Sequence, residues 1–80
     1  MVMEIPVIDV AATGENIKSL RCRAGISVGE LQEIFGFNSP QAIYKWQRGL
    51  ALPTVDNLAI LASAFGVAID DILVYRKIEL

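Results

Sequence analysis

The sequence predicts an all-α domain of five short helices, with a short extension at each end that could form a β-strand. Four glycines, Gly25, Gly36, Gly49 and Gly66, are each followed at once by an apolar residue. This pattern is typical of helices that end in the left-handed conformation. Between these glycines, apolar residues recur every three or four positions, as on one face of an amphipathic helix.

Serine or threonine, which cap helix N-termini, precedes four of the helices. These caps are Thr13, Ser27, Ser39 and Thr54. Ser27 and Glu30 have the spacing of a capping box, in which each side chain accepts the other's backbone N–H. Because proline is favoured at the first helical position, the third helix should begin at about Pro40.

Apolar spacing supports each helix. The expected buried stripes are Ile17, Leu20 and Ala24; Val28, Leu31, Ile34 and Phe35; Ile43 and Trp46; Val55, Leu58, Ala59, Ala62 and Phe65; and Ile69, Ile72 and Leu73. Trp46 shares its register with Ile43, which favours a core position over a platform for stacking bases.

The two ends, Met1 to Val10 and Val74 to Leu80, are rich in branched and apolar residues and could be strands. Pro6 would confine the first of them to a sheet edge. Such short runs leave open whether the strands pair with each other or across a dimer. The chain is accordingly divided into an N-terminal extension, 1–12, a helical domain, 13–73, and a C-terminal tail, 74–80.

Composition limits the function. There is no histidine and one cysteine, so the usual zinc ligand sets are absent, and Cys22 is expected to be buried. Without a signal peptide or an apolar run near the ~18 residues of a membrane span, we expect a cytoplasmic protein without a membrane partner. No cofactor, metal or small-molecule ligand is expected. The 54% hydrophobic content is high for 80 residues and suggests a homodimer.

The net charge of −2 weighs against a nucleic-acid partner, because phosphate binding depends on clustered Lys and Arg. The distribution of charge matters more than its sum. Basic residues gather at 18–23 and at 45–48, whereas several acidic residues lie in the C-terminal third. One face could therefore be locally basic.

Two short helices joined by a tight glycine turn, 28–35 and 40–48, meet the requirements of a helix-turn-helix over about 27–49. Further runs extend the pattern: 16–21, Gly25-Ile26-Ser27, 31–36, 43–49, Pro53 and 66–73. Together, over roughly residues 16–73, they resemble the Xre/Cro-like phage-repressor family.

The resemblance implies a five-helix DNA-binding domain whose third helix, about 40–48, lies in the major groove. It implies a sequence-specific transcriptional regulator that acts as a repressor. Periodicity turns Gln41, Tyr44 and Lys45 outward, with Pro40 at the leading end. Gln41 suits an adenine edge and Lys45 can donate to guanine. Tyr44 could bind a phosphate, contact a thymine methyl or simply cover the helix.

Phosphate contacts are expected from five positions. These are Ser39, Arg48, Arg21, Lys18 and the backbone amide of Val28. The amide would use the positive end of the second helix. Each charged residue could instead be an ordinary solvated surface group.

The sequence departs from the family pattern in four ways. Val28 stands in place of a glutamine that clamps the DNA backbone, and Gln47 stands in place of a glutamate that the family pairs with Arg21. A neutral Gln47 should hold Arg21 less strongly and free it for phosphate. The turn after Gly36 is one residue longer, which could shift the entry of the third helix. The loop 50–52 is apolar rather than basic.

Leu50 and Leu52 are the candidate dimer contacts, since relatives dimerise near this loop and exposed leucines would otherwise be wet. A two-fold dimer would read a palindromic operator in double-stranded DNA. The alternative is a protein-interaction module, such as an antitoxin-like or adaptor domain. An enzyme is not expected, because no histidine, metal cluster or glycine-rich phosphate loop is present.

Overall fold

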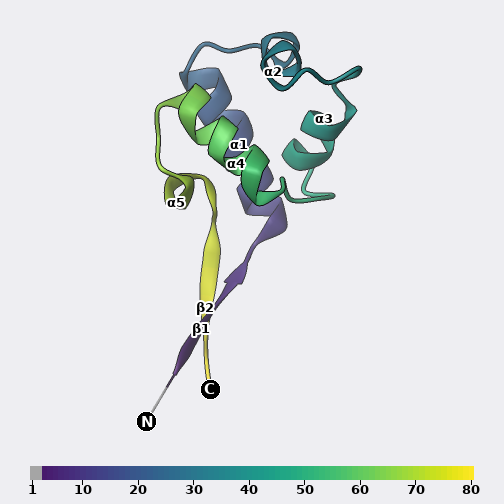
Figure 1. The fold of residues 1–80 in the computed structure, drawn as a ribbon. Helices are drawn as coiled ribbons and strands as arrows, with labels where there is room; N and C mark the ends of the chain where they lie inside the picture. Colours follow the sequence, from purple (N-terminus) through teal and green to yellow (C-terminus); the bar gives the residue numbers. More distant parts are fainter. Residues whose placement is uncertain (1–2) are drawn as a thin grey trace.

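The computed structural model describes residues 3–80, which form five helices and one two-stranded sheet (Figure 1). In chain order the elements are β1 (Glu4–Ile8), α1 (Val10–Arg23), α2 (Val28–Phe35), α3 (Gln41–Gln47), α4 (Val55–Phe65), α5 (Ile69–Ile72) and β2 (Tyr75–Glu79). The predicted five-helix domain with strand-forming extensions is confirmed. Met1 and Val2 of the predicted first strand lie outside the described residues.

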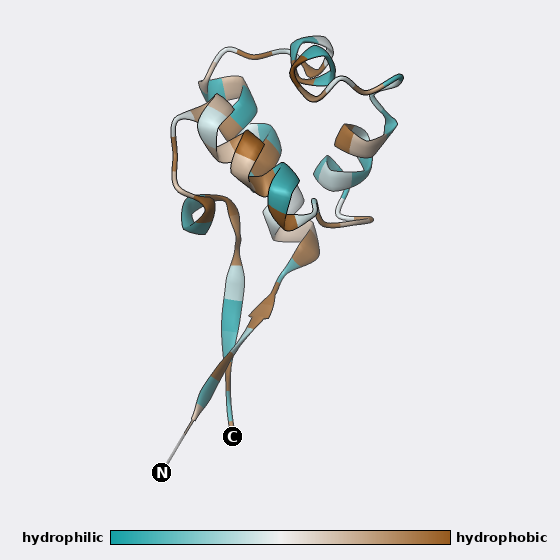
Figure 2. Cartoon of the chain, viewed as in Figure 1, coloured by the Kyte–Doolittle hydropathy of each residue, from teal (hydrophilic) through white to brown (hydrophobic). Residues whose placement is uncertain are grey.

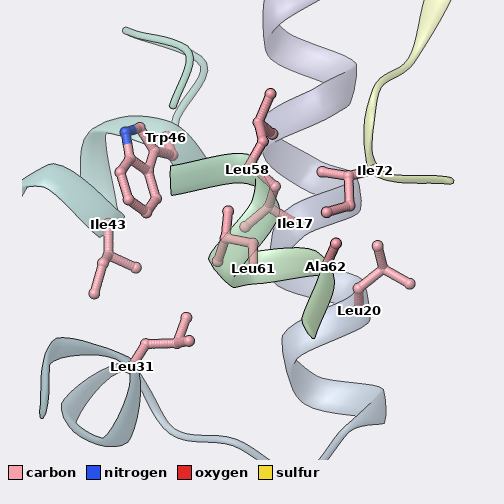
Figure 3. Close-up of a cluster of buried hydrophobic side chains, with 9 residues drawn as sticks. All are labelled: Ile17, Leu20, Leu31, Ile43, Trp46, Leu58, Leu61, Ala62 and Ile72. Carbon is pink, nitrogen blue, oxygen red and sulfur yellow. The ribbon is translucent and has the colours of Figure 1, made fainter. Parts of the chain in front are cut away.

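The core lies between α1, α3 and α4, with one side chain each from α2 and α5 (Figure 3). Its buried members are Ile17, Leu20, Leu31, Ile43, Trp46, Leu58, Leu61, Ala62 and Ile72. Ile43 and Trp46 are buried together, as their shared register predicted. The core therefore fixes which face of α3 remains outside.

The predicted helix ends are confirmed at the glycines. All four have φ between 69° and 73°, the left-handed conformation. The capping box also forms: Glu30 N–H donates to Ser27 Oγ at 3.0 Å, and Ser27 N–H donates to Glu30 Oε1 at 3.1 Å. These local signals set the limits of α2 without help from distant residues.

Two predicted helix starts are wrong. Asp9, not Thr13, caps α1 by accepting the N–H of Ala12 at 2.9 Å. Thr13 is fully buried inside α1, and its hydroxyl accepts the N–H of Val74 at 2.9 Å. In α3, Pro40 occupies the N-cap, so the helix begins one residue later than expected, at Gln41.

Several apolar positions differ from the predicted stripes. Ile34 is 51% exposed and Val55 is 77% exposed, because α2 buries only Leu31 fully and Val55 begins its helix. Ala24 and Ala59 are also exposed. Leu61, absent from the predicted stripe, is fully buried. Cys22, expected in the core, is exposed, because it lies two residues beyond Leu20 and on the other side of α1.

β1 and β2 pair with each other as an antiparallel ribbon that projects from the helical body and carries both chain ends (Figure 1). This settles how the two strands pair within one chain. Thr13 joins the ribbon to the body through Val74. The neighbouring Asn16 joins α1 to α5, because its side chain donates to the carbonyls of Asp71 and Ile72 at 2.8 and 2.9 Å. Across residues 3–80, no helix has both the length and the apolar character needed to span a membrane.

Candidate nucleic-acid interface

The outward face of α3 is a polar surface. Ile43 and Trp46 point into the core, which leaves Gln41, Tyr44 and Lys45 exposed. An open concavity of about 350 Å³ lies along this face. It is lined by Ser39, Pro40, Gln41, Tyr44, Lys45, Arg48 and Leu50. The structure thus gathers all four residues expected to read bases, together with two of the expected phosphate contacts.

An aromatic cluster holds the inner side of α3. The Phe35 and Phe37 rings stack at 4.9 Å, and the Trp46 indole meets them edge-on at 5.4 and 6.1 Å. Such edge-to-face pairs contribute ~0.5–1.5 kcal/mol each beyond area burial. Phe37 belongs to the turn, so the turn and α3 are fixed as one unit.

The far end of α3 lies unusually close to α1. A Cβ added to Gly14 would come within 2.2 Å of the Trp46 carbonyl oxygen and 2.9 Å of the Gln47 oxygen. A Cβ on Gly49 would come within 2.6 Å of the Ala11 Cα. Only glycine allows the two backbones this separation. The position of α3 on the body therefore depends on both glycines.

Arg21 links α1 to both ends of the helix-turn-helix. Its Nε donates to Gln47 Oε1 at 2.9 Å, and an Nη donates to the Ile26 carbonyl at 2.8 Å. The amide oxygen of Gln47 thus accepts a hydrogen bond from Arg21 where the family has a carboxylate, but without the added attraction of opposite charges. The weaker hold of a neutral Gln47 on Arg21 stays a prediction. Arg21 is half-buried and outside the concavity.

Tyr44 and Arg48, one helical turn apart, contact each other. The guanidinium carbon of Arg48 lies 6.0 Å from the centre of the Tyr44 ring, a cation–π arrangement. The ring therefore supports the arginine at the rim of the concavity. Lys45 adds a second cation to the same lining.

The N-terminus of α2 carries an anion. Glu30 is exposed, and the hydrogen bonds from the backbone N–H and the hydroxyl of Ser27 lower the pKa of its carboxyl group. It is therefore ionised at neutral pH, next to the Val28 amide that was expected to bind phosphate. Glu33, also exposed, lies one turn further along α2.

The remaining expected site residues are less closely grouped. Lys18 is exposed on α1 and does not line the concavity. Leu50 is 69% exposed and forms part of its wall, whereas Leu52 is 38% exposed and lies outside it. Within residues 3–80, no group of three metal-ligating side chains comes together.

Sequence reasoning missed the residues of α1 that fix its neighbours: Gly14 lies against α3, and Thr13 and Asn16 bond to the C-terminal segment. Gly14 lies inside a helix without a neighbouring turn signal, so only the approach of Trp46 reveals its role. Asn16 and Thr13 bond to backbone more than fifty residues away. The one available signal was a glycine in a helix interior, where it is unfavourable unless another chain segment comes close.

The comparisons with known proteins agree with this geometry. The HTH_3 family model, described as helix-turn-helix, matches residues 17–72. No curated protein sequence matches the chain. Among solved structures, the restriction-modification controller protein C.AhdI from Aeromonas hydrophila is 22% identical with a TM-score of 0.70, covering 80% of this chain and 96% of that one.

Two further structures are similar. The clp gene regulator ClgR from C. glutamicum is 27% identical with a TM-score of 0.67, covering 78% of this chain and 79% of that one. The hypothetical transcription factor NHTF from Neisseria is 25% identical with a TM-score of 0.69, covering 82% and 76% respectively.

Proposed function

The chain belongs to the Xre/Cro-like helix-turn-helix family of DNA-binding transcription regulators, and we propose that it reads a specific site in the major groove of double-stranded DNA with α3. The observation that carries this proposal is the concavity along α3, where an amide, a phenol, an ammonium and a guanidinium line one surface. These groups supply donors for base edges and phosphates alike.

Within this surface we assign base reading to Gln41 and Lys45, with Tyr44 and Pro40 beside them. An amide can bond an adenine edge in two places, and a lysine can donate to guanine. Arg48, supported by the Tyr44 ring at 6.0 Å, is assigned to a phosphate, which positions the protein without reading sequence.

The other proposed phosphate contacts lie at the edge of the concavity or outside it. Ser39 shares the lining of the concavity, and Lys18 is free to reach outward from α1. The bonds that Arg21 makes to Gln47 and Ile26 favour a positioning role, with phosphate contact left to its outer nitrogen. The Val28 amide must act beside the charge of Glu30.

We propose that the active form is a homodimer that binds a palindromic operator. Leu50 and Val55 are 69% and 77% exposed, and Leu52 lies between them in the chain. Such apolar side chains beside a DNA-reading helix favour a two-fold contact. A dimer on its operator would exclude other proteins from that DNA, so repression in the cytoplasm is the proposed outcome.

Selection of binding sites from random duplex DNA, followed by affinity measurements over a range of salt concentrations, tests the proposal. We expect an enriched site with two-fold symmetry and an affinity that falls with salt. Gln41→Ala should relax preference at one base position by ~1–3 kcal/mol, whereas Arg48→Ala should weaken all sequences alike. Equal losses on every sequence for both variants would refute this division of roles.

A protein-interaction module is the second candidate. It is favoured by the exposed carboxylates of Glu30 and Glu33 on α2 and by the apolar residues near Leu50. Under this alternative, no DNA site would be enriched and any weak binding to DNA would not depend on α3. The same selection experiment, repeated with Lys45→Ala, separates the two candidates.

A further inference from the structure

We propose that the outer edge of β2 pairs with β2 of a second copy, joining two ribbons into a four-stranded antiparallel sheet. This surface is separate from α3 and from the loop 50–52, so the inference goes beyond DNA reading. It rests on three features of the ribbon: its hydrogen-bond alternation, its one blocked edge and its charges.

The alternation shows which backbone groups of β2 are unpaired. Asp9 N–H donates to Val74 O at 2.8 Å, and Leu80 N–H donates to Met3 O at 2.9 Å. In the same register, Ile5 faces Ile78 and Val7 faces Arg76. Hydrogen-bonded pairs alternate along an antiparallel ladder, so these residues bond inward. The N–H and C=O groups of Tyr75, Lys77 and Glu79 therefore point outward.

The two edges of the ribbon differ. On β1 the outward positions include Pro6, which has no N–H to offer, so this edge resists the addition of a strand. Its partner across the ribbon is Lys77, whose N–H points away from β1. All five residues of β2 are exposed. β2 is therefore the edge that can accept another strand.

The side chains favour a second copy as that strand. Glu4 and Glu79 face each other across the ribbon, where like charges destabilise the pair. The single ion pair of the ribbon joins Lys77 to Glu4 at 3.5 Å. Antiparallel pairing of two copies can place Lys77 opposite Glu79 of the second copy, twice, and so give a cation to Glu79, which forms no ion pair among residues 3–80.

The charges of Lys77 and Glu79 also favour one register between the two β2 strands. With Lys77 opposite Glu79, the two-fold axis passes through Ile78, which is 47% exposed and would then contact its counterpart. If the two-fold axis passed through residue 77 instead, Lys77 would face Lys77 of the second copy. If it passed through residue 79, Glu79 would face Glu79. Both are like-charge pairs, which are unfavourable directly across strands.

Pairing of two copies would also stabilise the ribbon. Figure 2 shows both hydrophilic and hydrophobic residues on each strand. By alternation, Met3, Ile5, Val7 and Ile78 share one face. A lone two-stranded ribbon is marginal in water, whereas three or more strands with an apolar face can be stable. Joining the two ribbons through their β2 strands gives a sheet of four.

Cross-linking tests the proposal in the full chain with Cys22→Ser as background, since Cys22 is exposed. Residues at a non-hydrogen-bonded pair lie ~4.5 Å apart at Cα, within disulfide reach. Oxidised at micromolar concentration, Ile78→Cys should form a disulfide dimer as its main product. Ile5→Cys, which lies on the same face but on the blocked strand, should not form a disulfide between copies. Equal cross-linking of both variants, or none in Ile78→Cys, overturns the proposal.

Charge reversal tests the register within the cross-linking background. Lys77→Glu and Glu79→Lys should each reduce the disulfide to the level of Ile5→Cys. A mixture of the two should restore it as a heterodimer, because each reversed charge then faces its opposite. Unchanged melting of the helices would show that the body is intact. Failure of the mixture to restore cross-linking would contradict this register.

Discussion

α2 and α3 form one helix-turn-helix, yet their exposed surfaces carry opposite charges. The exposed side of α2 carries Glu30 and Glu33, and its N-terminus is closed by a capping box that includes a carboxylate. The exposed side of α3 carries Lys45 and, at its C-cap, Arg48. Its N-cap residue, Pro40, makes no side-chain hydrogen bond, and Ser39 Oγ accepts the N–H of Gln41 at 3.5 Å. The difference supports the proposal that α3 makes the main contact with DNA, while α2 holds α3 in place.

The largest expected effect is on stability, when a buried side chain that anchors α3 in the core is removed. Trp46→Ala removes a buried indole and its contacts with Phe35 and Phe37. We expect a loss of ~3–5 kcal/mol in the free energy of unfolding, measured by urea denaturation. Ile34→Ala, at a half-exposed apolar position on α2, is the control and should cost less than a quarter of that. Similar losses would mean that α2 is as deeply anchored as α3.

Two glycines inside helices, one packed against α3 and one on α2, should respond to substitution in opposite ways. Gly14→Ala forces a Cβ against the Trp46 carbonyl at 2.2 Å and should destabilise the protein by ~1–3 kcal/mol. Gly29→Ala on α2 meets only Ser27 Oγ at 3.8 Å, and should stabilise by ~0.5–1 kcal/mol because alanine is the better helix former. Thermal melts of both variants check the signs. A stabilising Gly14→Ala would show that α3 tolerates displacement.

The charge of α2 gives a smaller effect on binding. Glu30→Gln keeps a side chain that can complete the capping box but removes an anion beside the first turn. We expect affinity for every duplex sequence to rise roughly two- to fivefold at low salt and less at high salt. Glu33→Gln, one turn away, is the matched control for the general loss of negative charge. An unchanged affinity in Glu30→Gln would place this end of α2 away from phosphates.

The smallest expected effect is on stability in acid. The pKa of Glu30 is lowered in the folded protein by its bonds from Ser27, so the unfolded chain binds the proton first as the pH falls. Its contribution is therefore present above the ordinary glutamate range and is lost as the pH falls through the lowered pKa. Urea midpoints between neutral pH and pH ~3 should fall less steeply in Glu30→Gln. An identical slope would contradict this assignment.

Local chemistry explains what could be predicted. The left-handed glycines, the capping box and the outward set on α3 follow from neighbours within four residues, and the structure reproduces them. The start of α1 could not be predicted in this way, because Thr13 matches a cap by type but is buried against Val74 from the far end of the chain. Ile34 was misplaced because a periodic stripe does not show how much of it a neighbouring element covers. Cys22 was misplaced because its burial was expected from residue type, although it lies off the buried stripe of α1.

The ribbon has a consequence for the order of folding. β1 precedes all five helices in the sequence and β2 follows them, so the pairing of Ile8 with Tyr75 must close a loop that contains the whole helical body. The helices need mainly local contacts, and long loops close at an entropic cost that nearby contacts avoid. The helical body should thus form while β1 is still unpaired, and the Thr13 hydroxyl should remain without Val74 until the ribbon closes. Amide hydrogens of the ribbon should accordingly exchange before those of α1 and α4.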